Sequence, residues 1–366
     1  MTYKLLGADG RPYSSTTPGT LGGHRRSKGY GRLDCPTALR WIEKGHYVSH
    51  RVFFADEATA LAAGYRPCAV CLPERYAAWK ACEMTVRLIP RPPFDGGHLL
   101  GFLAARAIPG VETASPSAFT RPLSLPGGPA SIALRLRRRE VEAAVRVSDR
   151  RDIHEAVRRS RWLLDLDADP TAIAAALGDD PLLAPLVSAR PGLRSPGAAD
   201  GAELAVRAVV GQQVSVAGAR TLLGRLADAH GAPYAGARLF PTSERLAAVD
   251  PETLPMPRAR ARTLGALART LSEGDLDLRP GADGERTKAR LLAIPGIGPW
   301  TADYIALRAL GDPDVFLASD LGVRRALERL GGDARAAERW RPFRSYATHH
   351  LWAAAGGPRS ARKPAG

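Results

Sequence analysis

The stretch Leu291–Leu310 reads LLAIPGIGPWTADYIALRAL, two helix-like apolar runs joined by Pro-Gly-Ile-Gly-Pro. Gly296 and Gly298 permit backbone conformations and close approaches that a Cβ would forbid. Pro295 fixes the entry to the turn, and Pro299 suits the first turn of the next helix, where its missing N–H costs nothing. The pattern predicts a helix-hairpin-helix whose turn presents free N–H groups at a helix N-terminus. Such a turn can bind an anion, although a compact corner between two helices would use the same residues.

The composition favours an acidic partner. The chain has 366 residues, a formal net charge of +15 and 45% hydrophobic residues. This length suggests two or three domains, and the charge favours nucleic acid as a partner. The alternative source of the charge is an arginine-rich genome composition.

The sequence also indicates a compartment. We find no run of about 18 uncharged apolar residues, so no membrane span is expected. The N-terminus, MTYKLLGADGRPYSS, lacks the apolar core of a signal peptide. Four cysteines in so long a chain argue against a disulfide framework. A cytoplasmic protein is expected.

Local patterns divide the chain into a strand-rich and a helical part. Residues 125–147, LPGGPASIALRLRRREVEAAVRV, alternate apolar and other side chains and predict a turn followed by two strands. From about residue 153 the periodicity is helical. The predicted helical stretches are 202–227, 258–273, 287–293, 299–310, 321–330 and 334–354.

The hairpin and its surroundings resemble a known family. After the hairpin, DVFLASD ends at Asp320. Together they resemble the helix-hairpin-helix DNA glycosylase superfamily, and most of all its AlkA-type branch, 3-methyladenine DNA glycosylase II. Four further segments resemble that branch in the same order: GFLAARAIPGVET (101–113), ARPGLRSPG (189–197), AVRAVVGQQVSVAGA (205–219) and RWRPFRSYATHHLWAAAG (339–356).

The resemblance implies an α+β fold that is mainly α. Residues 1–83 would form a small zinc-binding domain, and residues 84–165 an antiparallel, TBP-like sheet domain. Residues 166–361 would form two helical subdomains that flank a cleft, with the hairpin at about 287–310. A monomer is expected.

The resemblance also implies the reactive group. In the family an aspartate about two dozen residues beyond the hairpin is catalytic, and here it is Asp320. Breaking an N-glycosidic bond builds oxocarbenium character on the sugar, which a carboxylate can stabilise while it orients or deprotonates water. The alternative role of Asp320 is a helix N-cap. Asp303 is a lesser candidate and is expected to be structural.

A base pocket and a DNA-contact surface follow from the same resemblance. N-alkylated purines are cations, and electron-rich rings attract cations; for each ring alone the alternative is core packing. The expected pocket residues are Phe102, Gln212, Trp300, Tyr304 and Trp352. The expected contacts to double-stranded DNA are Gln213, Pro295, Gly296, Ile297 and Gly298.

Two details of that surface differ among family members. The family often has leucine where this chain has Gln213, the wedge that fills the space left by an extruded base; a glutamine can still fill that space and hydrogen-bond the widowed base. Bifunctional members carry a lysine where this chain has Trp300, so a monofunctional enzyme is expected. The hairpin carbonyls of family members can hold a monovalent cation.

All four cysteines lie within residues 35–82. Cys68-Ala-Val-Cys71 with Cys35 offers three thiolates, and zinc takes four ligands. His50 or His46 could complete the set, whereas Cys82 lies beyond the CxxC unit. A redox pair and an inert pair are the alternatives.

The segment RVFFADEATALAAGYRPCAVC resembles the Ada-type metal-binding domain. In that domain the first of four cysteines accepts a methyl group from a phosphotriester. Cys35 matches the first cysteine, and Leu39 stands in place of the second. The metal ligands implied are Cys35, His50, Cys68 and Cys71. A DNA-binding damage sensor, or a glycosylase that also accepts methyl groups at Cys35, are the alternative functions.

Overall fold

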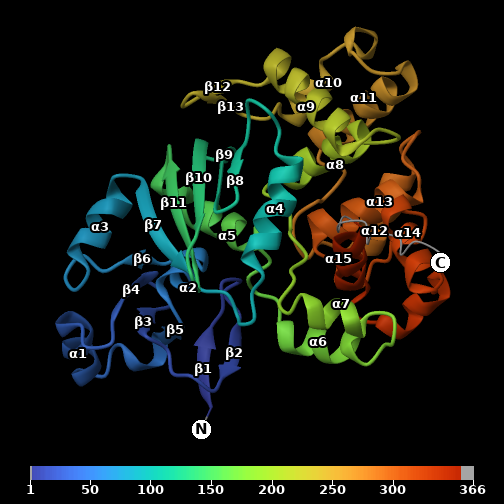
Figure 1. The fold of residues 1–366 in the computed structure, drawn as a ribbon. Coiled ribbons are helices and arrows are strands. Elements are labelled where there is room, and N and C mark those ends of the chain that lie inside the picture. Colours follow the sequence, from blue (N-terminus) through green and yellow to red (C-terminus); the bar gives the residue numbers. More distant parts are fainter. Residues whose placement is uncertain (1, 356–366) are drawn as a thin grey trace. The chain divides into compact units, whose positions relative to one another are not determined.

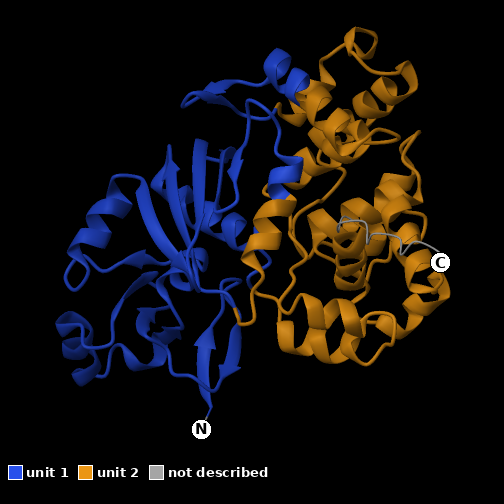
Figure 2. Ribbon diagram, viewed as in Figure 1, with its two compact units in different colours: residues 1–90, 103–166, 224–240 blue, residues 91–102, 167–223, 241–366 orange. Residues whose placement is uncertain are grey.

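The structure, a computed structural model, describes residues 2–355. The chain forms two compact units (Figure 2). Unit 1 contains the residues up to 90, together with 103–166 and 224–240, and unit 2 contains 91–102, 167–223 and the residues from 241 onward. The first boundary falls within the proline-rich segment 89–93.

Unit 1 contains a five-stranded antiparallel sheet in the order β7-β11-β10-β9-β8 (Figure 1). Its strands are β7 (Glu83–Leu88), β8 (Thr113–Ser115), β9 (Ala118–Leu125), β10 (Gly128–Leu136) and β11 (Val141–Val147). Buried and exposed side chains alternate along β7, so one sheet face is covered. Helix α5 (Ile153–Leu163) packs against these strands. The two strands predicted within 125–147 are confirmed.

The first 82 residues of unit 1 carry two smaller sheets and three helices. The elements are β1 (Tyr3–Leu6), β2 (Pro12–Ser15), β3 (Leu21–His24), β4 (Gly29–Arg32), α1 (Pro36–Glu43), β5 (Arg51–Phe54), α2 (Glu57–Ala62), β6 (Arg66–Pro67) and α3 (Pro73–Lys80). Strands β1 and β2 pair with each other, and the others follow the order β5-β3-β4-β6.

This N-terminal part is joined to the five-stranded sheet. Helix α2 packs against β7 and α5, and the N–H of Val147 donates to the carbonyl of Cys82 at 3.0 Å. Arg75 pairs with Glu57 and donates to the carbonyl of Thr85. The predicted domains 1–83 and 84–165 therefore lie within one compact unit, apart from residues 91–102.

Unit 2 is helical. Its helices include α6 (Pro170–Gly178), α7 (Ala184–Ala189), α8 (Gly201–Val210), α10 (Ser243–Ala247), α11 (Arg258–Ser272), α12 (Gly284–Leu292), α13 (Pro299–Ile305), α14 (Leu321–Leu330) and α15 (Arg344–Ala355). Helices α4 (Gly96–Arg106) and α9 (Val216–His230) contribute residues to both units. One core of unit 2 surrounds the fully buried Trp340.

Two predicted helical stretches are broken in the structure. Residues 202–227 form α8 and α9, because the chain turns between them and Gln213 adopts a left-handed φ of 56°. Residues 334–354 form a 3₁₀ segment, Ala334–Trp340, and then α15, because Pro342 lacks the N–H that a continuous helix requires. The last residues of the predicted 166–361 domain lie outside the described residues.

The hairpin joins α12 to α13, and α13 continues as a π-helical turn, Ala306–Leu310. Across residues 2–355 we find no helix with the length and apolarity needed to cross a bilayer.

Candidate functional site

Asp320 is held by donors from three elements of unit 2. It is the N-cap of α14, and its Oδ1 accepts the N–H of Val323 at 3.0 Å. The same oxygen accepts the indole N–H of Trp352, on α15, at 2.9 Å. Its Oδ2 accepts the indole N–H of Trp300, on α13, at 3.2 Å. The structure thus confirms the helix cap that was the alternative role of Asp320, and both oxygens of its carboxylate accept hydrogen bonds.

The four predicted pocket rings form a connected set. Trp300 and Tyr304 stack with centroids 5.3 Å apart and planes 11° apart. Tyr304 lies 6.3 Å from Trp352, and Trp352 lies 6.3 Å from Phe102 with planes 26° apart. Phe102 is buried, whereas the other three rings are only half-buried. The indoles of Trp300 and Trp352 therefore turn their N–H edges toward Asp320, and electron-rich rings beside a carboxylate suit a flat cationic guest.

Arg308 supports this set and was not predicted. It is 4% exposed, and its guanidinium lies 4.8 Å from the ring centroid of Phe102. It donates to the hydroxyl of Tyr304 at 3.2 Å and to the carbonyls of Pro196 and Gly197. Arg308 therefore holds the hydroxyl group of Tyr304 in place. Its helical spacing from Tyr304, four residues, was the available signal.

The two glycines of the hairpin serve different purposes. Gly296 has φ 88°, and a Cβ there would lie 2.0 Å from Oγ1 of Thr263. That hydroxyl donates to the carbonyl of Pro295 at 3.0 Å, which joins α11 to the hairpin. Gly298 has φ −95°, and a Cβ there would meet no atom within 4 Å. Gly296 is thus required by the fold, whereas the space beside Gly298 is open to a ligand.

The N–H groups of Gly296 and Gly298 donate to no group of the described chain. The hairpin therefore presents two free donors at the start of α13, as the sequence predicted. Ile297 between them is buried and anchors the turn.

The two glutamines of the α8–α9 turn, Gln212 and Gln213, differ in their contacts. The side-chain amide of Gln212 donates to the carbonyl of Gly296 at 3.0 Å and to the hydroxyl of Thr301 at 3.1 Å. Gln212 therefore connects the α8–α9 turn to the hairpin. This contact is separate from the pocket role that the sequence predicted for it. Gln213 is exposed, and its amide bonds to no other described residue.

The large hydrophobic residues exposed in the described part of unit 2 lie on the same elements. They are Val214, Val216, Leu292 and Leu321. The first two flank the α8–α9 turn, Leu292 precedes the hairpin, and Leu321 follows Asp320.

Asp303 has a structural partner. Its carboxylate lies 2.6 Å from the ammonium of Lys288, so the pair links α12 to α13 across the hairpin. This agrees with the structural role expected for Asp303. Among the described residues of unit 2, Lys288 is the only lysine.

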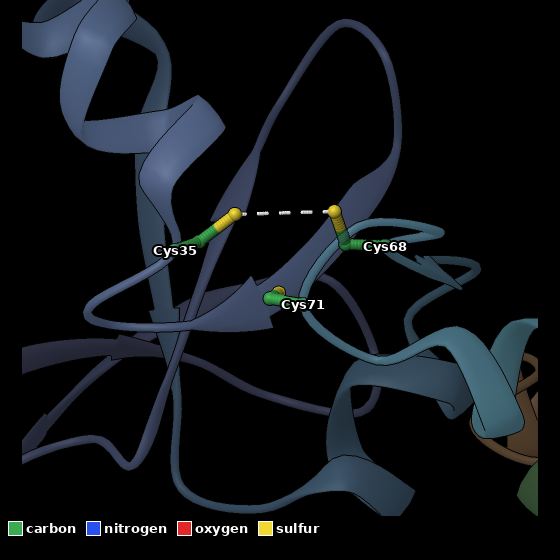
Figure 3. Close-up of side chains that lie close together, drawn as sticks. All are labelled: Cys35, Cys68 and Cys71. Atoms are coloured by element: carbon green, nitrogen blue, oxygen red, sulfur yellow. Dashed lines mark hydrogen bonds between the residues drawn. The ribbon is translucent and has the colours of Figure 1, made fainter.

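In unit 1, three of the four cysteines converge. The sulfur atoms of Cys35, Cys68 and Cys71 all lie within 4.8 Å of one another, and those of Cys35 and Cys68 are 3.9 Å apart (Figure 3). A Cβ on Gly31 of β4 would lie 2.6 Å from the sulfur of Cys71, so a larger residue at this position would displace that sulfur from the cluster. All four cysteines are free, and Cys82 is outside the group.

The thiols of the cluster titrate differently. Burial raises the pKa of Cys71 to about 12. Burial acts in the same direction on Cys68, but hydrogen bonds from the backbone of Cys71 and Val70 bring its pKa below the ordinary value.

The fourth ligand predicted for this cluster is not in place. His50 does not belong to the group of mutually close ligand atoms, and neither does His46. The ring of His50 instead packs edge-on against His24, with centroids 5.4 Å apart. The sequence offered His50 and His46 as candidates to complete the cluster, but the fold directs His50 toward His24.

With this geometry established, the fold and the site define the class of the chain. Residues 85–200 match the AlkA N-terminal domain, and residues 206–341 match the HhH-GPD superfamily of base excision DNA repair proteins. A 3-methyladenine DNA glycosylase from Archaeoglobus fulgidus has a similar fold, with a TM-score of 0.63 at 22% identity over 74% of this chain and 98% of that chain.

The chain belongs to the AlkA family of the HhH-GPD superfamily. It is 38% identical over 282 residues to DNA-3-methyladenine glycosylase 2 of Escherichia coli, covering 72% of this chain and 94% of that protein. It is 46% identical over 287 residues to a probable bifunctional transcriptional activator/DNA repair enzyme AlkA of Mycobacterium tuberculosis, covering 75% of this chain. That match spans 58% of the Mycobacterium protein. The matched family regions begin after the cysteine cluster.

Proposed function

We propose that this chain is a DNA glycosylase that releases 3-methyladenine and related N-alkylated purines from double-stranded DNA. The observation that carries the proposal is the carboxylate of Asp320, held by the indoles of Trp300 and Trp352 within a set of aromatic rings. Such a reaction needs a pocket for a cationic base, a carboxylate that stabilises the developing sugar cation, and an adjacent turn that binds phosphate.

The reaction begins with extrusion of the damaged base from the duplex. The exposed Gln213 would fill the space that the base leaves, and the free N–H groups of Gly296 and Gly298 would hold a nearby phosphate. The hairpin carbonyls of Pro295 and Gly296 each accept one side-chain hydrogen bond, so a monovalent cation would share them with Thr263 and Gln212.

Bond cleavage then proceeds with little help from an acid. The bond between C1′ and the base nitrogen breaks, and its electron pair neutralises the cationic base. Asp320 stabilises the oxocarbenium character of the sugar and orients or deprotonates the water that attacks C1′. The products are a free base and an abasic site.

The same site supports a monofunctional enzyme. Cutting the strand through a Schiff base requires a free amine near C1′. The position at the start of α13 is Trp300, and the ammonium of Lys288 is paired with Asp303. We therefore expect hydrolysis without strand cleavage.

We further propose that Cys35, Cys68 and Cys71 bind zinc. Two thiolates about 2.3 Å from one tetrahedral ion lie about 3.8 Å apart, and the sulfur atoms of Cys35 and Cys68 are 3.9 Å apart. Free thiols persist in a reducing cytoplasm. Methyl transfer to Cys35 is not favoured, because this residue is 4% exposed and an electrophile needs access to its sulfur.

The experiment is base release from methylated duplex DNA, with and without a later alkaline treatment that cleaves abasic sites. The expected result is release of methylated purine, with strand breaks after alkali alone. DNA binding without any release would instead favour a sensor, and breaks before alkali would contradict the monofunctional assignment.

A further inference from the structure

The cysteine cluster of unit 1 contains three soft donors and lacks a fourth. Within residues 2–355, no histidine, aspartate or glutamate has a ligand atom that joins the three sulfur atoms. His50, the nearest sequence candidate, is engaged with His24. A zinc ion bound here would therefore have one coordination position that the described chain does not fill.

The surroundings decide on which side that position lies. The backbone of Gly31 closes one side of the cluster, since a Cβ there would already meet Cys71. Cys35 is buried as the N-cap of α1, whereas Cys68 and Cys71 are half-buried. Val70, between the two, is 60% exposed. The open position thus lies on the solvent side, beside the loop that carries Cys68 and Cys71.

The three sulfur donors, more than the side chains around them, favour a soft fourth ligand. Leu33 and Leu39, on either side of Cys35 in the sequence, are 41% and 42% exposed, and the ion pair of Arg32 and Asp34 beside them is exposed as well. Helix α1 buries none of its residues. The guanidinium of Arg32 is paired with the carboxylate of Asp34 at 2.6 Å, so the two side chains together add no net charge beside Cys35. Thiolate ligands suit zinc and other thiophilic ions.

We propose that the zinc site is open: three cysteines hold the ion, and a small-molecule thiolate from solution completes the tetrahedron. A closed structural site takes four ligands from the chain, whereas an open site keeps an exchangeable position. Cys35, Cys68 and Cys71 would hold the ion, and an incoming thiol would lose its proton to solvent and bind through its sulfur, with no change of oxidation state. This inference rests on the proposed zinc site and is independent of base release.

Cobalt substitution of the full chain tests the proposal. Cobalt(II) reports its ligands through charge-transfer bands from sulfur and through visible bands that depend on geometry. We expect one cobalt per chain, and a titration with 2-mercaptoethanol at constant pH should shift the visible bands and add sulfur charge-transfer intensity. Cys68→Ala should lose the bound metal, while Cys82→Ala, which removes a cysteine outside the cluster, should match the parent.

His50→Ala separates the open site from a closed one. We expect its cobalt spectrum and its response to the thiol to match those of the parent. If His50→Ala changes the spectrum, or if the thiol changes nothing, the site is closed and the open-site proposal is wrong while the zinc proposal stands. If the parent binds no cobalt or zinc, both are wrong. Neither outcome bears on the glycosylase, because base release is measured separately.

Discussion

The substitution Asp320→Asn tests the central assignment by replacing one carboxylate oxygen with an amide NH2 group, which removes the negative charge. The carboxylate is half-buried, so an effective dielectric constant of about 20 applies. A sugar cation about 4 Å away would then gain about 4 kcal/mol from the negative charge. Loss of that energy slows the chemical step about 10³-fold.

The same substitution should cost little stability. Asparagine caps helices about as well as aspartate, so the bond from Val323 should survive. One indole, that of Trp300, would face an amide N–H in place of Oδ2, at a cost of about 1 kcal/mol. A slow enzyme that remains folded is therefore expected.

The assay is single-turnover release of methylated purine, accompanied by thermal unfolding and by the dissociation constant for duplex DNA with an abasic site. Asp303→Asn is the matched control, because it makes the same chemical change in unit 2 at a carboxylate that pairs with Lys288. It should release base within about 3-fold of the parent. A rate for Asp320→Asn within about 10-fold of the parent would refute the electrostatic role of Asp320.

Three further predictions concern the supporting structure. Gly296→Ala should destabilise the protein by about 1–3 kcal/mol in chemical denaturation, because of its φ and its contact with Thr263, whereas Gly298→Ala should stay folded and bind abasic DNA more weakly. Trp352→Phe should slow base release by about 10-fold, since it keeps a ring and loses the indole donor to Asp320; parental rates would contradict that positioning role. Burial lowers the pKa of His350 to about 4. As the pH falls, the unfolded chain therefore protonates this histidine before the folded chain does, and the free energy of unfolding should fall by about 3 kcal/mol between pH 6.5 and 4. His350→Gln should remove that share of the pH dependence, which urea titrations would measure.

Local patterns predicted those features that depend on neighbouring residues. The strands within 125–147 followed from alternation, and α11 and α14 from helical periodicity, because each period reflects one covered face. The hairpin followed from proline and glycine positions that specify backbone angles. Asp320 was singled out by the family resemblance, in which the catalytic aspartate follows the hairpin by about two dozen residues.

Tertiary structure decided which distant residues meet. Trp352 reaches Asp320 from 32 residues away, and Gly296 must be glycine because Thr263 of another helix occupies the space of its Cβ. Neither contact leaves a local signal. Cys35 meets Cys68 across 33 residues, as the family resemblance implied, yet His50 does not join them. The type and spacing of donor residues indicate which of them are candidate ligands. The direction in which each side chain points is set only by the packed backbone. The sequence therefore determined the candidates, and the fold decided which of them meet.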